Sequence, residues 1–100
     1  MLARIKKALR IVTNAFDDEL TGIIASCIQD LNLAGIVGET VVPASTDELV
    51  IQAVIAYAKW RFGEPDNPDK ARELYEIQKA QLAVATGYTD WLVNNNGQID

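Results

Sequence analysis

The sequence predicts an all-α fold: a small bundle of about four helices, with an irregular loop after the second helix and an extended C-terminal tail. Apolar residues recur at spacings of three and four in successive segments, as they do on the buried face of a helix. Residues that start or stop helices, among them Asn, Ser, Gly and Pro, separate these segments. The chain has 100 residues, of which 49% are hydrophobic and 23% charged, so it can build one modest core.

The first predicted helix spans residues 2–11 and has one apolar and one basic side. The apolar side holds Leu2, Ile5, Leu9 and Val12. The basic side holds Arg4, Lys6, Lys7 and Arg10. Residues 1–14 therefore carry a charge of +4, whereas the rest of the chain holds five bases and 14 acids. Such a basic side is typical of the solvent-facing side of an amphipathic helix, but it could also contact DNA, a membrane or an acidic partner.

The second predicted helix spans residues 17–34. Either Thr13 or Asn14 could cap its start. Three acids fall in its first turn, where carboxylates suit the positive end of the helix dipole: Asp17, Asp18 and Glu19. An unbroken apolar stripe follows: Leu20, Ile23, Ile24, Cys27, Ile28 and Leu31. Gly35 can adopt the left-handed conformation that ends the helix.

Residues 36–46 are predicted to form an irregular loop that contains Gly38 and Pro43. Val41 and Val42 could pair briefly as a strand within it. Ser45 and Glu48 then stand three residues apart, which is the spacing of a capping box at the start of a helix.

The third predicted helix spans residues 48–63 and is apolar on nearly every side. Its β-branched residues would also fit a buried strand, but sixteen residues ending at Gly63 are too many for one ordinary strand. Gln52 and Lys59 lie on one narrow stripe, and several neighbours must cover the rest. We therefore expect this helix to be the central one. Its aromatic residues are expected in the core or at its edge: Tyr57, Trp60 and Phe62.

The fourth predicted helix spans residues 68–86, with Asn67 as its cap and Pro68 at its first position. It has apolar residues on two sides. One side holds Leu74, Ile77, Gln81 and Val84, and the other holds Tyr75, Leu82 and Ala85. Gly87 ends the helix, so the chain divides into a helical domain of residues 1–87 and a tail of residues 88–100.

The residue types that most enzymes rely on are missing. The chain has no histidine, which excludes histidine-based catalytic dyads and triads. The one cysteine, Cys27, lies within an apolar stripe and is more typical of a core residue than of a nucleophile; it can form no internal disulfide, which suits a reducing cytoplasm. The glycines match no phosphate-binding motif, and the acids lack the spacing of a calcium loop. We expect no catalytic residue, no metal and no cofactor, and therefore no enzyme.

Four stretches of the sequence, in their order along the chain, resemble tailed-phage head–tail connector proteins, the small helical adaptors also described as DNA-packaging proteins. The stretches are ALRIVTNAFDDEL, DLNLAGI, DELVIQAVIAYAKWRFG and DKARELYEIQKAQLAVATGY. The similarity covers about residues 2–88 and rests on apolar positions and short phrases, with no catalytic signature.

The resemblance implies a non-enzymatic helical subunit that assembles into a closed ring of about a dozen copies. In that family the ring sits under the portal of the DNA-filled capsid, extends the DNA channel and offers a platform for the next protein. The expected partners are other copies of the chain, the portal protein, the next head-completion or tail protein, and passing DNA without sequence-specific contact. No membrane partner is expected. The expected location is the head–tail junction of the virion, after assembly in the bacterial host cytoplasm.

The resemblance also implies two contact regions. The C-terminal segment, residues 88–100, commonly contacts the portal in that family, and its candidate residues here are Tyr88, Trp91, Leu92 and Val93. A tryptophan in so polar a tail either fastens the tail to its own domain or docks onto a partner. The loop of residues 36–46 would project toward the channel or the next ring, with candidates Val37, Glu39, Thr40, Val41 and Val42. The net charge of −5 suits a DNA conduit, because an acidic lining repels phosphates.

A second hypothesis remains open from the residues themselves. The chain could be a small cytoplasmic helical adaptor or regulatory module that binds a protein or DNA through its basic N-terminal helix. Oligomeric state separates the two hypotheses, because only the connector requires a ring.

Overall fold

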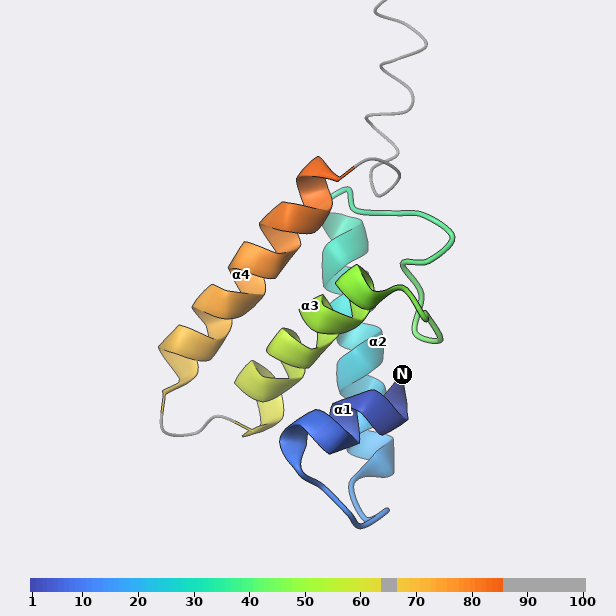
Figure 1. The fold of residues 1–100 in the computed structure, drawn as a ribbon, viewed down its shortest axis with the longest axis vertical. Coiled ribbons are helices and arrows are strands. Elements are labelled where there is room, and N and C mark those ends of the chain that lie inside the picture. Colours follow the sequence, from blue (N-terminus) through green and yellow to red (C-terminus); the bar gives the residue numbers. More distant parts are fainter. Residues whose placement is uncertain (64–66, 86–100) are drawn as a thin grey trace, which may run out of the picture.

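The computed structural model describes residues 1–63 and 67–85. These contain four α-helices and one π-helical segment: α1 (Leu2–Leu9), α2 (Asp17–Leu33), α3 (Glu48–Ala58), η1 (Lys59–Gly63) and α4 (Pro68–Val84). No strand forms within the described ranges, so the predicted all-α fold is confirmed (Figure 1). The predicted division between residues 87 and 88 lies outside the described residues and stays a prediction.

Helix α3 is the centre of the bundle, as predicted. It packs against α1, α2 and α4, and Figure 1 shows it lying across α2 with α4 alongside. Six of its eleven residues are buried: Val50, Ile51, Ala53, Val54, Tyr57 and Ala58. The apolar character of this helix on nearly every side is therefore explained by neighbours on nearly every side.

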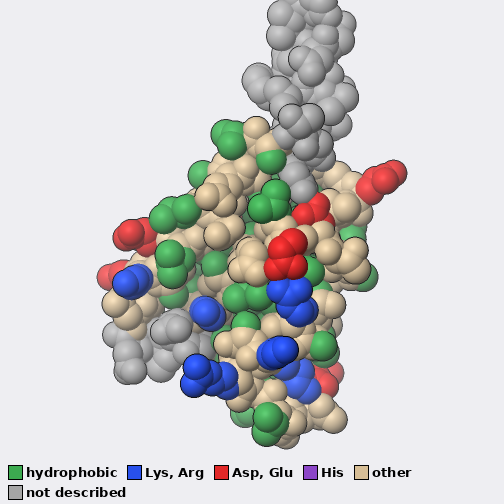
Figure 2. All heavy atoms as spheres, in the orientation of Figure 1, with side chains coloured by type: hydrophobic (Ala, Val, Ile, Leu, Met, Phe, Trp, Pro, Cys, Tyr) green, Lys and Arg blue, Asp and Glu red, His purple; other side chains and the backbone are tan. Residues whose placement is uncertain are grey.

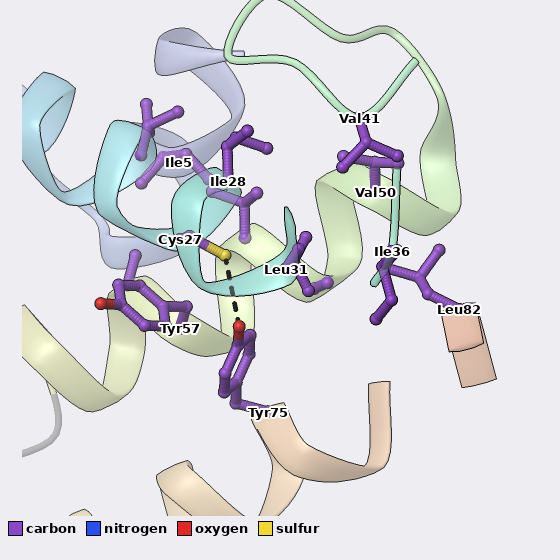
Figure 3. Packing of buried hydrophobic residues seen from close by; sticks show 14 of the residues in the cluster. Ile5, Cys27, Ile28, Leu31, Ile36, Val41, Val50, Tyr57, Tyr75 and Leu82 are labelled. Atoms are coloured by element: carbon purple, nitrogen blue, oxygen red, sulfur yellow. Dashed lines mark hydrogen bonds between the residues drawn. The ribbon is translucent and has the colours of Figure 1, made fainter. Parts of the chain in front are cut away.

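The core draws side chains from all four helices and from the loop after α2 (Figure 3). Ile5 of α1 and Leu20 of α2 are completely buried. Ile36 and Val41 of the loop are also buried, so part of residues 36–46 belongs to the core. The brief strand expected at Val41 and Val42 is wrong, because both residues lie in a bend.

Helix α1 is shorter than predicted. It ends at Leu9, because Arg10 adopts a left-handed conformation with φ 60° and its N–H bonds to carbonyls of the last turn. The chain then turns, and Val12 is 99% exposed. The expectation that Val12 shares the apolar side of this helix is therefore wrong; Ile11 packs against the core in its place.

The residues predicted to cap α2 do not do so. The N-cap is Phe16, without a side-chain hydrogen bond. The Thr13 hydroxyl instead accepts a bond from the Ala15 N–H, and the Asn14 amide oxygen accepts one from the Lys6 ammonium. At the other end of α2 the prediction for Gly35 is confirmed, since its φ is +87°.

The predicted capping box at the start of α3 is also wrong. Asp47 is the N-cap, and its carboxylate accepts a bond of 3.0 Å from the Leu49 N–H. Ser45 accepts a bond from the Asp47 N–H and so shapes the turn before the helix. Glu48 does not cap the helix. Its carboxylate accepts a bidentate pair of hydrogen bonds from the Arg4 guanidinium, at 2.7 and 3.1 Å, and this pair connects α1 to α3.

The predicted helix of residues 48–63 changes character at Lys59, where the π-helical segment begins. This segment places Trp60 against Tyr75 of α4, with the rings stacked at 6.2 Å. Tyr57 is buried, whereas Trp60 and Phe62 are partly buried against the core, which confirms the prediction for these aromatic residues.

Helix α4 begins as predicted and has two different sides. The Asn67 side chain accepts a bond from the Lys70 N–H, and proline follows the cap. The buried side consists of Ala71, Tyr75 and Leu82. The other side, with Leu74, Ile77 and Val84, stays exposed. The predicted last residues of this helix, 85 and 86, lie past its observed end at Val84 or outside the described residues.

A partly buried polar network at the edge of the core holds α4 onto α2. The Tyr75 hydroxyl donates to the Asp30 carboxylate at 2.5 Å, and the Lys79 ammonium donates to the same oxygen at 3.1 Å. The Cys27 thiol points at the Tyr75 hydroxyl from 3.9 Å (Figure 3). Burial alone would raise the pKa of Asp30, but the bonds from Tyr75 and Lys79 outweigh it and hold that pKa below its usual value.

We expect Tyr75→Phe to lower the free energy of unfolding by about 1–3 kcal/mol, because the Asp30 carboxylate loses its shortest hydrogen bond. Urea denaturation followed by circular dichroism measures this loss. Tyr57→Phe is the matched control, since no hydrogen bond of its hydroxyl is seen within the described residues. Equal effects of the two substitutions would contradict the role given to the Tyr75 hydroxyl.

The Arg4–Glu48 pair predicts a pH effect. The hydrogen bond from Arg4, followed by that from Gln52, lowers the pKa of Glu48 to about 2. The pair therefore stabilises the fold at pH values above the unfolded pKa of about 4.3, and this contribution is lost as the pH falls through the folded value.

We expect Arg4→Gln to raise the pKa of Glu48 by at least one unit, as measured by NMR titration of the glutamate side chains. Arg10→Gln serves as the control, because Arg10 makes no ion pair within the described ranges. A Glu48 pKa that stays low in the Arg4 variant would show that another group holds it.

Candidate interaction surfaces

The outer side of α4 presents an unpartnered apolar stripe. Leu74 and Ile77 are each 48% exposed, and Val84 is 81% exposed. With Gln81 they follow one another at intervals of three, four and three residues, which is the spacing of a helix seam that packs against another element. Figure 2 shows hydrophobic side chains reaching the surface along α4. Among the described helices, only α4 presents three exposed large apolar side chains at helical spacing.

A groove of 310 Å³ lies where α3 and the start of α4 meet. Its described lining consists of Ala56, Lys59, Asn67, Lys70, Ala71 and Leu74. Leu74 belongs to both the groove and the apolar stripe, so the two surfaces are continuous. The groove has an apolar lining with two ammonium groups beside it. Neither ammonium group forms an ion pair with a described carboxylate.

A second set of exposed apolar residues lies away from α4. Val42 of the loop is 38% exposed and Leu49, in the first turn of α3, is 43% exposed. In Figure 1 the loop of residues 36–46 and α4 lie on opposite sides of α3. The molecule thus has apolar residues on two different sides, built from different segments.

The predicted loop residues have different environments. Val41 is buried and Val37 is half-buried, whereas Glu39 and Thr40 are exposed. The Thr40 hydroxyl donates to the Asp47 carboxylate at 3.1 Å, which holds the loop to the start of α3. The interpretation of this loop as a contact with the channel or the next ring stays a prediction.

Part of the basic side of α1 is used inside the molecule. Arg4 pairs with Glu48, and Lys6 pairs with Asp17 at 2.9 Å. Lys7 and Arg10 are exposed, and neither forms an ion pair with a described acid. These two acids offset two of the four positive charges. The basic surface near α1 in Figure 2 therefore has a net charge lower than the +4 counted from the sequence.

The described residues include no group of three or more histidine, cysteine or acidic side chains that could hold a metal ion. Burial raises the pKa of the Cys27 thiol to about 12, so it is almost entirely protonated at neutral pH. Among the helices that the structure describes, none is both long and apolar enough to cross a membrane.

The predicted tail residues Tyr88, Trp91, Leu92 and Val93 lie outside the described residues, so their role as portal- or partner-binding residues stays a prediction. The groove was not predicted from the sequence. Lys59 and Lys70 belong to separate helical segments, and only the packing of α4 against α3 brings them to one groove. The sequence signal that could have pointed to the groove is the position of Lys70 four residues before Leu74, on the line of the exposed stripe.

The comparisons with known proteins bear on these surfaces. A family model described as "Phage connector protein" matches residues 1–89, a range that includes all of the described helices. No curated protein and no solved structure gives a significant match. A match over most of the chain, on a structure that is all-α as the resemblance implied, settles the family: the chain belongs to the phage connector proteins.

Proposed function

We propose that this phage connector protein is the head–tail adaptor of a tailed phage or prophage. Its copies form a ring below the portal, extend the DNA channel and join the head to the tail. Family membership supports a connector role in general, and with it a structural role rather than an enzymatic one. The observation that supports ring formation is the exposed apolar stripe of α4, with Leu74, Ile77 and Val84.

The stripe supports a contact with another protein because its three apolar residues are exposed together along one helix. Monomeric proteins rarely expose long contiguous apolar patches, and such patches mark interaction sites. Burial of apolar surface contributes about 25 cal/mol per Å², so three large side chains covered in each subunit are a substantial driving force when repeated around a ring. The helix is already held on its other side by Tyr75, so contact with a neighbour requires no refolding.

A ring needs two lateral faces that differ, since a self-complementary face produces a closed dimer. The chain offers such a pair. The stripe of α4 lies on one side of α3, and the loop residues with Leu49 lie on the other. A head-to-tail contact between these two sides would close by rotation.

The charge of the chain supports passage of DNA through the ring. A net charge of −5 in each copy disfavours adhesion of the phosphate backbone, because like charges repel and few counterions are released. The exposed Glu39 lies in the same loop as Val42, and we propose that Glu39 faces the channel or the next ring while Val42 contacts the neighbouring subunit. The further partners are the portal protein above the ring and the next head-completion or tail protein below it. The site of action is the head–tail junction of the virion.

We expect Ile77→Glu to weaken self-association of the chain at least tenfold, because a carboxylate in the stripe would have to be desolvated in the contact. Multi-angle light scattering over a concentration series, alone and in the presence of the portal protein, measures the effect. Ala83→Glu is the matched control: it adds the same charge to an exposed position of α4 that lies off the stripe. Circular dichroism confirms that both variants keep their helices.

A chain that stays monomeric both alone and with the portal protein would contradict the proposal. It would favour the small adaptor that acts through its basic N-terminal helix. That alternative requires that the chain bind DNA or a protein in a salt-sensitive way, and that this binding be lost when Lys7 and Arg10 are replaced by alanine.

A further inference from the structure

We propose that the groove between α3 and α4 receives the apolar part of the C-terminal tail, residues 88–93, from a neighbouring copy. The inference rests on the proposed ring and deepens it, because it names the segment that links one subunit to the next. This inference assigns Tyr88, Trp91, Leu92 and Val93 to a contact between subunits instead of the portal contact that the resemblance implies, and it leaves residues 94–100 for the portal.

The groove is suited to an apolar side chain flanked by an acid. Its volume of 310 Å³ lies at the lower end of the range of ligand pockets, about 300–1,000 Å³, which leaves room for one large side chain and little more. Ala56, Ala71 and Leu74 supply apolar surface, while Lys59 and Lys70 supply positive charge. An occupant that neutralises these two lysines as it buries an apolar group gains from both contacts.

The tail has this chemistry. Residues 86–100 contain two acids, Asp90 and Asp100, and no base. Asp90 directly precedes Trp91, so a carboxylate stands next to the largest apolar side chain of the segment. Tryptophan is the residue type most often found as the anchor of an interface, since it buries a large area in one pocket.

The distance along α4 favours a neighbour's tail over the chain's own. The groove lies at the start of α4, near Ala71, whereas the tail departs beyond Val84 at the opposite end. These two residues are separated by about 20 Å along the helix, at a rise of 1.5 Å per residue. The seven residues from Ala85 to Trp91 reach at most about 25 Å beyond Val84 when fully extended. The chain's own Trp91 would therefore reach the groove only if the tail turned back and ran nearly extended along α4, whereas a neighbour's tail can approach the groove from another direction.

Disulfide cross-linking distinguishes the two cases. Ala56→Cys places a thiol in the groove, and Thr89→Cys places one beside the proposed anchor without changing Trp91. When the two single variants are mixed and oxidised, we expect a disulfide-linked dimer that contains one chain of each kind. In the double variant we expect a ladder of linked oligomers. Each single variant oxidised alone is the control, and the native Cys27 is too buried to take part.

Linked dimers absent from the mixture, or a double variant that closes within one chain, would overturn the inference. In the first case the groove does not receive the tail, and in the second the tail folds back onto its own domain. Rings that still form in either case leave the proposed function intact, so its failure is distinguished from that of the inference.

Charge reversal tests the same contact without cysteines. We expect the double substitution Lys59→Glu and Lys70→Glu to weaken self-association at least tenfold, and Asp90→Lys to restore it partly when added to that variant. Arg72→Glu, at an exposed position of α4 outside the groove, is the matched control. Weakening without any rescue, or equal weakening by the control, would contradict the proposed pairing of Asp90 with the groove.

Discussion

The whole structure depends on the need to cover α3. A helix that is apolar on nearly every side is stable in water only when neighbours surround it, and α1, α2 and α4 supply that cover. The loop after α2 contributes Ile36 and Val41 to the same core, which explains why a segment of irregular backbone is partly buried. The cover is short of complete at the start of α3, where Leu49 is 43% exposed, and at its end, where the groove lies.

The two sides of α4 connect the fold to the function. Its inner side is fixed by Tyr75, whose hydroxyl joins Asp30 and Lys79 in one network. Because that network sets the rotation of the helix, it also decides which residues point outward. The exposed stripe is thus a consequence of the same contacts that stabilise the monomer, and the contact surface proposed above is already formed before any partner binds.

The sequence predicts the number, order and type of the elements because apolar spacing reports burial directly. The central position of α3 and the two-sided nature of α4 follow from the same signal. Helix starts are less predictable, since several polar residues compete for one cap: Asp47 takes the position that the spacing of Ser45 and Glu48 suggested for Ser45. The exposure of Val12 follows the left-handed turn at Arg10, and the π-helical segment accompanies the stacking of its Trp60 on Tyr75 of α4. Neither has a local sequence marker. The groove depends on how α4 packs against α3, and the sequence alone does not show that packing.

The burial of Cys27 has a consequence for the proposed ring. Each subunit would bring one thiol, and a closed ring would hold these thiols at high local concentration. Outside a host cell, dissolved oxygen and peroxides would convert accessible sulfhydryls into random covalent links or sulfenic acids. With its side chain at 0% exposure and its pKa raised by burial, the Cys27 thiol is protected from both reactions, so it would form no such links between copies of the proposed ring.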